Sequence, residues 1–213
     1  MTNATATSIR LPAEAPLTDG VSREEVRGRA AGIAVGAVMG LTWAGSAVST
    51  LTSSAAVPVL IASVAVFAVL MTGARRVRRT STTTPPSAPP GADLRKMRRR
   101  FTLVVAGEFA AIFAAFNILA RTGHSQWAPA VICAAVGLHF VPLARLFRVR
   151  LYYATGAALC LVAATTMILG AAGAPAQLWQ LLPGFGAALA LWATSAGLLL
   201  TMAAALPPRH PAP

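Results

Sequence analysis

Two ionisable residues, Glu108 and His139, lie inside stretches of sequence that are otherwise apolar. An ionised side chain at the centre of a bilayer costs about 2.5–3.5 kcal/mol on insertion scales, so such residues usually face the interior of the protein. A Glu–His pair in a medium of low dielectric constant can hold or pass a proton, as proton-coupled transport requires. The alternative role is a neutral, hydrogen-bonded pair that locks two helices together.

The surrounding chain has the composition of a membrane protein. Of its 213 residues 56% are hydrophobic and only 11% are charged, which excludes an ordinary soluble domain. Six stretches are long enough to cross a bilayer as helices, since a span needs about 20 apolar residues. These predicted spans cover residues 30–49, 55–73, 101–120, 127–147, 151–172 and 178–206. We therefore predict an all-α fold, a polytopic transmembrane bundle of six helices.

The positive charges fix the orientation of this bundle. Seventeen of the eighteen Lys and Arg residues fall in segments that six spans would leave on one side of a membrane, and only Arg121 falls on the other. Lys and Arg concentrate in cytoplasmic segments, so both termini are predicted to be cytoplasmic. Trp127 and Trp179 at the predicted outer boundary, and Tyr152 and Tyr153 at the inner one, fit the aromatic belts of a membrane protein.

The orientation also gives the depth of the two ionisable residues. Glu108 lies seven residues inside the cytoplasmic end of the third span, about 10 Å deep at 1.5 Å per residue. His139 lies eight residues before the cytoplasmic end of the fourth span, about 12 Å deep. A short outer loop makes the two spans antiparallel neighbours. Glu108 and His139 are therefore predicted at nearly the same level, where they could touch.

Three further residues complete the candidate intramembrane polar site. Pro142 frees the carbonyl of Leu138 and is expected to kink the fourth helix near His139. Arg145 lies near the inner boundary, where we expect it to extend to lipid headgroups, although a reach toward Glu108 stays open. Asn117 lies about 180° around the third helix from Glu108. It is on the same helix face as Arg121, near the outer mouth.

The first span carries Gly32, Gly36 and Gly40, a repeated small-xxx-small spacing that allows another helix backbone to approach closely. It predicts a helix–helix contact, either within the chain or between protomers. Pro58 is interpreted as a first-turn proline of the second helix. Pro183, followed by glycine, is expected to break or kink the sixth helix.

The chain divides into five predicted regions. They are a disordered cytoplasmic tail (1–29), a transmembrane hairpin (30–73), a basic Pro/Thr-rich cytoplasmic loop (74–100), a four-helix transmembrane region (101–206) and a cytoplasmic tail (207–213). Near the end of the first tail, Ser22 could cap a short interfacial helix with Glu25 three residues on. The first span is expected to be uncleaved rather than a signal peptide.

The basic loop is predicted to set topology and to meet anionic lipid headgroups, at about 1 kcal/mol per charge. Its positive residues are Arg75, Arg76, Arg78, Arg79, Arg95, Lys96, Arg98, Arg99 and Arg100. These contacts account for the net charge of +12 without nucleic acid as a partner. An acidic protein partner for the loop, a homo-oligomer and another membrane partner are alternatives.

No recognised catalytic set or phosphate-binding glycine loop occurs in the sequence, so we expect no enzymatic activity, although an intramembrane enzyme stays open. Cys133 and Cys160 lack metal-ligand spacing and are interpreted as packing residues. No metal or other cofactor is predicted. A single lysine, Lys96, against seventeen arginines suggests a GC-rich bacterial gene and hence the bacterial inner (plasma) membrane.

The run VGLHFVPLA at residues 136–144, with Gly107 and Glu108 upstream, resembles small bacterial, actinobacterial-like, six-span membrane proteins of unknown function. The resemblance covers the third to fifth spans and implies a membrane location, not an activity. The residues themselves favour a small permease or proton-coupled transporter that uses Glu108 and His139. The alternative is a membrane scaffold or accessory subunit that acts through helix–helix contacts and the basic loop, with no transport or catalysis.

Overall fold

The computed structural model describes residues 23–80 and 92–205 of the chain. They form six α-helices and one 3-10 turn, and no strand occurs in these two ranges. All six helices are long and apolar enough to cross a membrane, so the prediction of an all-α fold with six such helices is confirmed. The elements are α1 (Arg23–Val48), α2 (Ser53–Thr80), α3 (Ala92–Arg121), η1 (Ser125–Trp127), α4 (Ala128–Phe147), α5 (Leu151–Ala171) and α6 (Leu178–Ala205).

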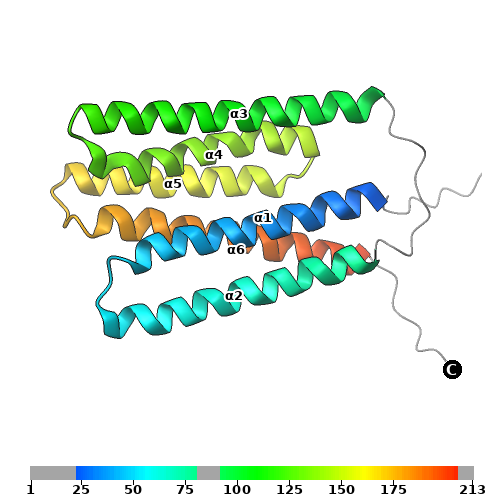
Figure 1. Cartoon of the computed structure of the whole chain (residues 1–213), viewed down its shortest axis with the longest axis horizontal. Helices are drawn as coiled ribbons and strands as arrows, with labels where there is room; N and C mark the ends of the chain where they lie inside the picture. The colour runs from blue at the N-terminus through cyan, green and yellow to red at the C-terminus, as the bar shows by residue number, and fades with distance from the viewer. Residues whose placement is uncertain (1–22, 81–91, 206–213) are drawn as a thin grey trace, which may run out of the picture.

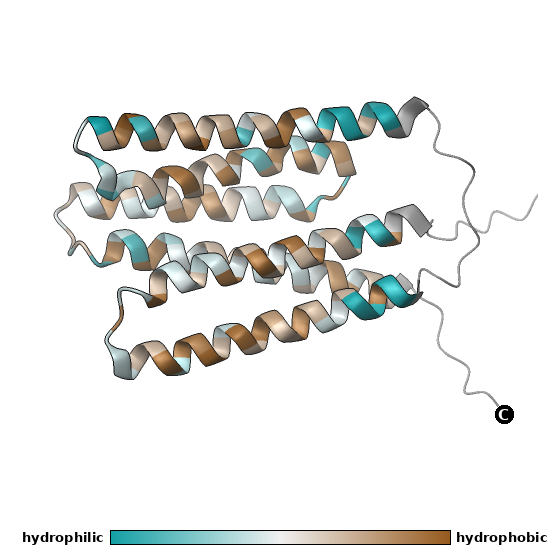
Figure 2. Ribbon diagram, viewed as in Figure 1, coloured by the Kyte–Doolittle hydropathy of each residue, from teal (hydrophilic) through white to brown (hydrophobic). Residues whose placement is uncertain are grey.

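The helices lie side by side with their axes roughly aligned, and α2 and α3 form opposite flanks of the bundle (Figure 1). The most extensive contacts join α1 to α6 and α4 to α5, and α5 also packs on α6. Helices α1, α2 and α3 carry hydrophilic residues toward the same end of the bundle (Figure 2). We call this the basic end; α1, α3 and α5 begin there, and α2, α4 and α6 finish there.

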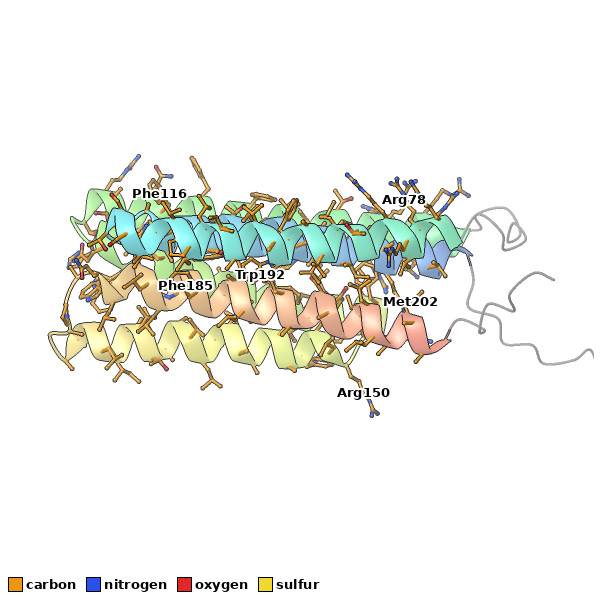
Figure 3. All side chains as sticks on the ribbon, turned by 90° about the horizontal axis from the view of Figure 1, so that it is seen from below. Arg78, Phe116, Arg150, Phe185, Trp192 and Met202 are labelled. Carbon is orange, nitrogen blue, oxygen red and sulfur yellow. The ribbon has the colours of Figure 1, made fainter. Side chains whose placement is uncertain are left out.

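The glycines of α1 form the contact with α6. A Cβ atom on Gly36 would collide with the Ser195 hydroxyl, and one on Gly40 would collide with the Trp192 indole. The Trp192 Nε1 donates to the Ala37 carbonyl at 3.3 Å, and Trp192 points from α6 toward the layer of α1 and α2 (Figure 3). The predicted helix–helix contact is confirmed, and α6 of the same chain occupies this face.

Helices α4 and α5 cross at a second pair of glycines. A Cβ atom on Gly137 would lie 2.9 Å from the Gly156 carbonyl oxygen, and one on Gly156 would lie 2.7 Å from the Gly137 oxygen. Backbones this close tolerate only glycine. Beside the crossing, the buried Cys133 thiol donates to the Leu159 carbonyl at 3.4 Å. This cysteine therefore packs α4 against α5.

Several helices extend beyond the predicted spans. Helix α1 begins at Arg23 and runs unbroken into the span, so residues 23–29 belong to α1 and not to a separate interfacial helix; Ser22 lies outside the described residues. Helices α2 and α3 continue through both basic blocks of the predicted 74–100 loop. Arg and Lys favour helix, and hydropathy marks where a bilayer would end rather than where a helix ends. At 28 and 30 residues, these helices exceed the roughly 20 that a span needs.

The prolines do not interrupt the helices. Pro58 is the sixth residue of α2 rather than a first-turn residue. Pro183 was predicted to break or kink the sixth helix; the break is wrong, because α6 runs unbroken from Leu178 to Ala205, and the kink stays a prediction. Pro183 is fully buried, and a Cβ atom on the following Gly184 would lie 2.6 Å from that of Ala47 on α1. Packing against α1 therefore holds α6 together at the point where one backbone hydrogen bond is lost.

Substitution of the α1 glycines tests the α1–α6 contact. We expect Gly36→Leu and Gly40→Leu each to lower the free energy of unfolding by about 1–3 kcal/mol, because the new side chain overfills a close-packed interface. Gly45→Leu is the matched control, since a Cβ atom at Gly45 meets nothing within 4 Å. Thermal unfolding of the purified variants in detergent measures the difference. Equal effects at all three glycines would contradict this account of the contact.

Candidate functional site

Glu108 and His139 are in contact. The Oε2 atom of Glu108 lies 3.3 Å from the Nε2 atom of His139, and the two side chains are 15% and 10% exposed. Glu108 comes from the middle of α3 and His139 from α4, the next helix along the chain. The contact anticipated from their matched depths is present, and its distance allows a shared proton or an ion pair. Its role in transport stays a prediction.

The pair lies at a flank of the bundle. Half-buried residues of α3 recur at helical spacing, at Glu108, Ile112, Ala115 and Leu119, and this row faces α4. The other face of the helix is open; Phe109 and Phe113, for example, are 67% and 71% exposed. Among the described elements, only α4 and η1 make extensive contact with α3. The site is therefore a seam between α3 and α4 and does not lie at the centre of the bundle.

Aromatic rings of α3, α4 and α5 form a series of contacts that begins at His139. The ring of Phe140 meets His139 edge-on at 6.3 Å between centroids and meets Tyr152 of α5 at 5.5 Å. Phe147 then contacts Tyr152 at 6.4 Å and Phe101 of α3 at 5.8 Å. These rings join α3, α4 and α5, and Phe140 places an apolar ring beside His139. Sequence reasoning missed the phenylalanines, although Phe140 and Phe147 lie seven residues apart on one helical face.

Of the other predicted site residues, only Pro142 is near the pair along the chain. The Asn117 side chain donates from Nδ2 to the Phe113 carbonyl of its own helix at 2.8 Å. Arg145 is exposed near the end of α4. Pro142 is half-buried inside α4, three residues after His139, and its kink stays a prediction. The structure thus brings together Glu108 and His139, with Pro142 nearby on the same helix.

A second polar group lies inside the bundle, between α5 and α6. The hydroxyls of Thr155 and Thr194 are 2.5 Å apart, and both residues are buried. One of the two hydroxyls donates to the other, and the accepting hydroxyl donates to a carbonyl of its own helix, as does the buried Ser195. These hydroxyls are satisfied, so they act as interhelical locks.

Neither site has the ligand set of a metal centre. In the ranges that the structure describes, no group of three or more His, Cys, Asp and Glu residues could hold a metal ion. Glu108 and His139 are only two such groups. A carboxyl and an imidazole in contact are able to exchange a proton directly.

Comparison of the chain with protein-family models, with curated proteins and with solved structures found no match in any of the three. The class of protein is therefore inferred from the helices alone. The described part of the chain has six helices compatible with membrane spans, as a multi-pass membrane protein would have.

A double-mutant cycle measures the strength of the α3–α4 pair. We expect Glu108→Leu and His139→Leu each to lower the free energy of unfolding by about 1–3 kcal/mol, because each leaves a mostly buried polar partner unpaired. The double variant should cost less than the sum, with a coupling energy on the order of 1 kcal/mol. Asn117→Leu combined with His139→Leu is the control and should be additive. Additivity of the Glu108 and His139 changes would mean that the contact contributes no stability.

Proposed function

We propose that this protein is a small permease or proton-coupled transporter of the bacterial inner (plasma) membrane, in which Glu108 and His139 carry the proton. The observation that supports this most is their 3.3 Å contact, with both side chains mostly buried, on helices compatible with membrane spans. An ionisable pair at such a depth is costly, and costly residues inside spans commonly serve ion or proton pathways.

The proposal includes an orientation. The basic end and both chain termini face the cytoplasm, because Lys and Arg concentrate on the cytoplasmic side of membrane proteins. Arg121, at the opposite end of α3, then lies at the external mouth. Protons would reach the pair from either side through movement of helix ends.

The chemistry of the pair suits proton coupling. With one proton between them, Glu108 and His139 form either two neutral groups or an ion pair, and both states have no net charge. A second proton leaves a net positive charge, which an apolar medium penalises. The difference in net charge can favour different arrangements of α3 on α4. Helix α3 is the natural mobile element, because among the described helices only α4 packs extensively against it.

A scaffold or accessory-subunit role is the alternative. Because the glycine face of α1 is filled by α6, such a protein would bind its partner or a second copy through other surfaces. The exposed row of Phe109, Phe113 and Phe116 on α3 is the surface that favours this alternative, since lipid and a partner helix would both accept it. A scaffold would not need the ionisable pair.

Flux measurements distinguish the two functions. In proteoliposomes with an imposed pH gradient, we expect proton uptake by the wild type and uptake no greater than that of empty vesicles for Glu108→Gln and His139→Gln. Asn117→Leu, on the same helix but bonded only to its own backbone, should retain uptake. Solutes for the flux assay would come from ligand-dependent thermal shifts across pH.

Retention of proton and solute flux by both pair variants would sink the transporter proposal. The scaffold alternative predicts a co-purifying membrane partner that remains bound to Glu108→Gln. Loss of that partner on replacement of Phe113 by Ala, with the fold intact, would then favour the alternative.

A further inference from the structure

Positive charge gathers where α3 and α4 meet at the basic end. Phe101 of α3 contacts Phe147 of α4, with ring centroids 5.8 Å apart. Arg100 directly precedes Phe101, and Arg148 directly follows Phe147, so one arginine from each helix is adjacent in sequence to this contact. Both arginines are exposed.

The helical geometry of α3 separates its arginines by direction. At about 100° per residue, Arg98 and Arg100 lie about 80° to either side of Glu108, whose row faces α4. Arg99 lies about 180° away, on the outer face. Of these arginines, only Arg100 is next to Phe101 in sequence. Arg100 of α3 and Arg148 at the end of α4 therefore flank the junction of the two helices, and we call this pair the junction cluster.

The acidic residues of α3 and α4 are few. Glu108 is the only acidic residue between positions 95 and 213, and it is paired with His139. Like charges on neighbouring helices repel, and this repulsion acts on α3, which packs extensively only on α4 and η1 among the described elements. An external anion bound between the arginines of α3 and α4 would attract both and so replace this repulsion.

The surroundings of the cluster favour a phospholipid as that anion. Phe101 and Phe147 are 41% and 37% exposed, so apolar rings lie directly beside the arginines at the end of the spans. A phospholipid could place its phosphate against the arginines and its acyl chain against the two rings. Arg guanidinium groups bind phosphate oxygens in pairs, and cytoplasmic leaflets carry anionic lipids. A soluble acidic protein or nucleic acid would leave the rings uncovered.

We propose that the junction cluster binds the phosphate groups of anionic phospholipids, and that bound lipid holds the basic end of α3 on α4 and so keeps Glu108 against His139. This inference rests on the α3–α4 contacts and is independent of transport. It makes the membrane's anionic lipid a regulator of the pair.

Thermal unfolding of the full chain in detergent tests the binding. We expect added phosphatidylglycerol to raise Tm by about 5 °C relative to phosphatidylcholine. The variant Arg100→Gln/Arg148→Gln should lose most of this rise. The matched control, Arg99→Gln/Arg150→Gln, removes the same charge and should keep it, since Arg150 points away from the bundle (Figure 3).

An equal rise in both double variants would show diffuse charge attraction and overturn the site. An equal rise when poly-glutamate replaces phosphatidylglycerol would indicate a soluble acidic partner instead, and would also overturn it. An equal Tm of the wild type in phosphatidylglycerol and in phosphatidylcholine would also overturn the proposed site.

Chemical labelling tests, without any flux assay, whether bound lipid holds α3 on α4. A membrane-permeant carbodiimide modifies intramembrane carboxyl groups, and Glu108 is the only carboxyl side chain after Asp93. We expect phosphatidylglycerol to reduce labelling of Glu108, measured by mass spectrometry, in the wild type but not in Arg100→Gln/Arg148→Gln. Equal labelling of the wild type in phosphatidylglycerol and in phosphatidylcholine would contradict the proposal that lipid holds α3 on α4, whatever the outcome for transport.

Discussion

An apolar medium offers no partner for a buried polar group, and this constraint governs the interior of the protein. In the described ranges, no buried side-chain nitrogen or oxygen lacks a hydrogen-bond partner. Ser195 bonds to the carbonyls of Leu191 and Ile33, and Thr155 meets Thr194. Glu108 and His139 follow the same rule, but theirs is a contact that can also change its protonation. The rule thus yields fixed locks in the interior and one titratable contact at the flank.

The two kinds of contact divide the bundle mechanically. Helices α1 and α6 approach through glycine so closely that Trp192 reaches the backbone of Ala37. Such interfaces resist deformation, because close-packed interiors transmit strain rather than absorb it. Helix α3 has a single extensive helical neighbour in the described structure and no buried residue in its most apolar window. The proposed proton-carrying pair therefore lies between α3, which packs extensively on the fewest other described α-helices, and its neighbour α4.

The contact of Glu108 with His139 was predictable because charge placement fixed the depth of each residue and a short loop fixed the neighbours. Other features leave weaker traces in sequence. The spacing of Gly36 and Gly40 marks a packing face, but nothing local identifies α6 as the partner, about 155 residues away. The flank position of α3 was missed because a membrane helix is apolar on its lipid face as well as its protein face. The helix ends were missed because hydropathy marks the end of the apolar stretch. The segment Arg75–Arg79 is basic but still belongs to α2.

The central claim is that Glu108 and His139 share a titrating proton across the α3–α4 contact. Infrared difference spectra of reconstituted protein across pH report a protonated carboxyl directly. The account predicts a carboxyl C=O band that is absent in Glu108→Gln and that titrates at a different pH in His139→Phe. A Glu108 band whose titration is the same with and without His139 would contradict it.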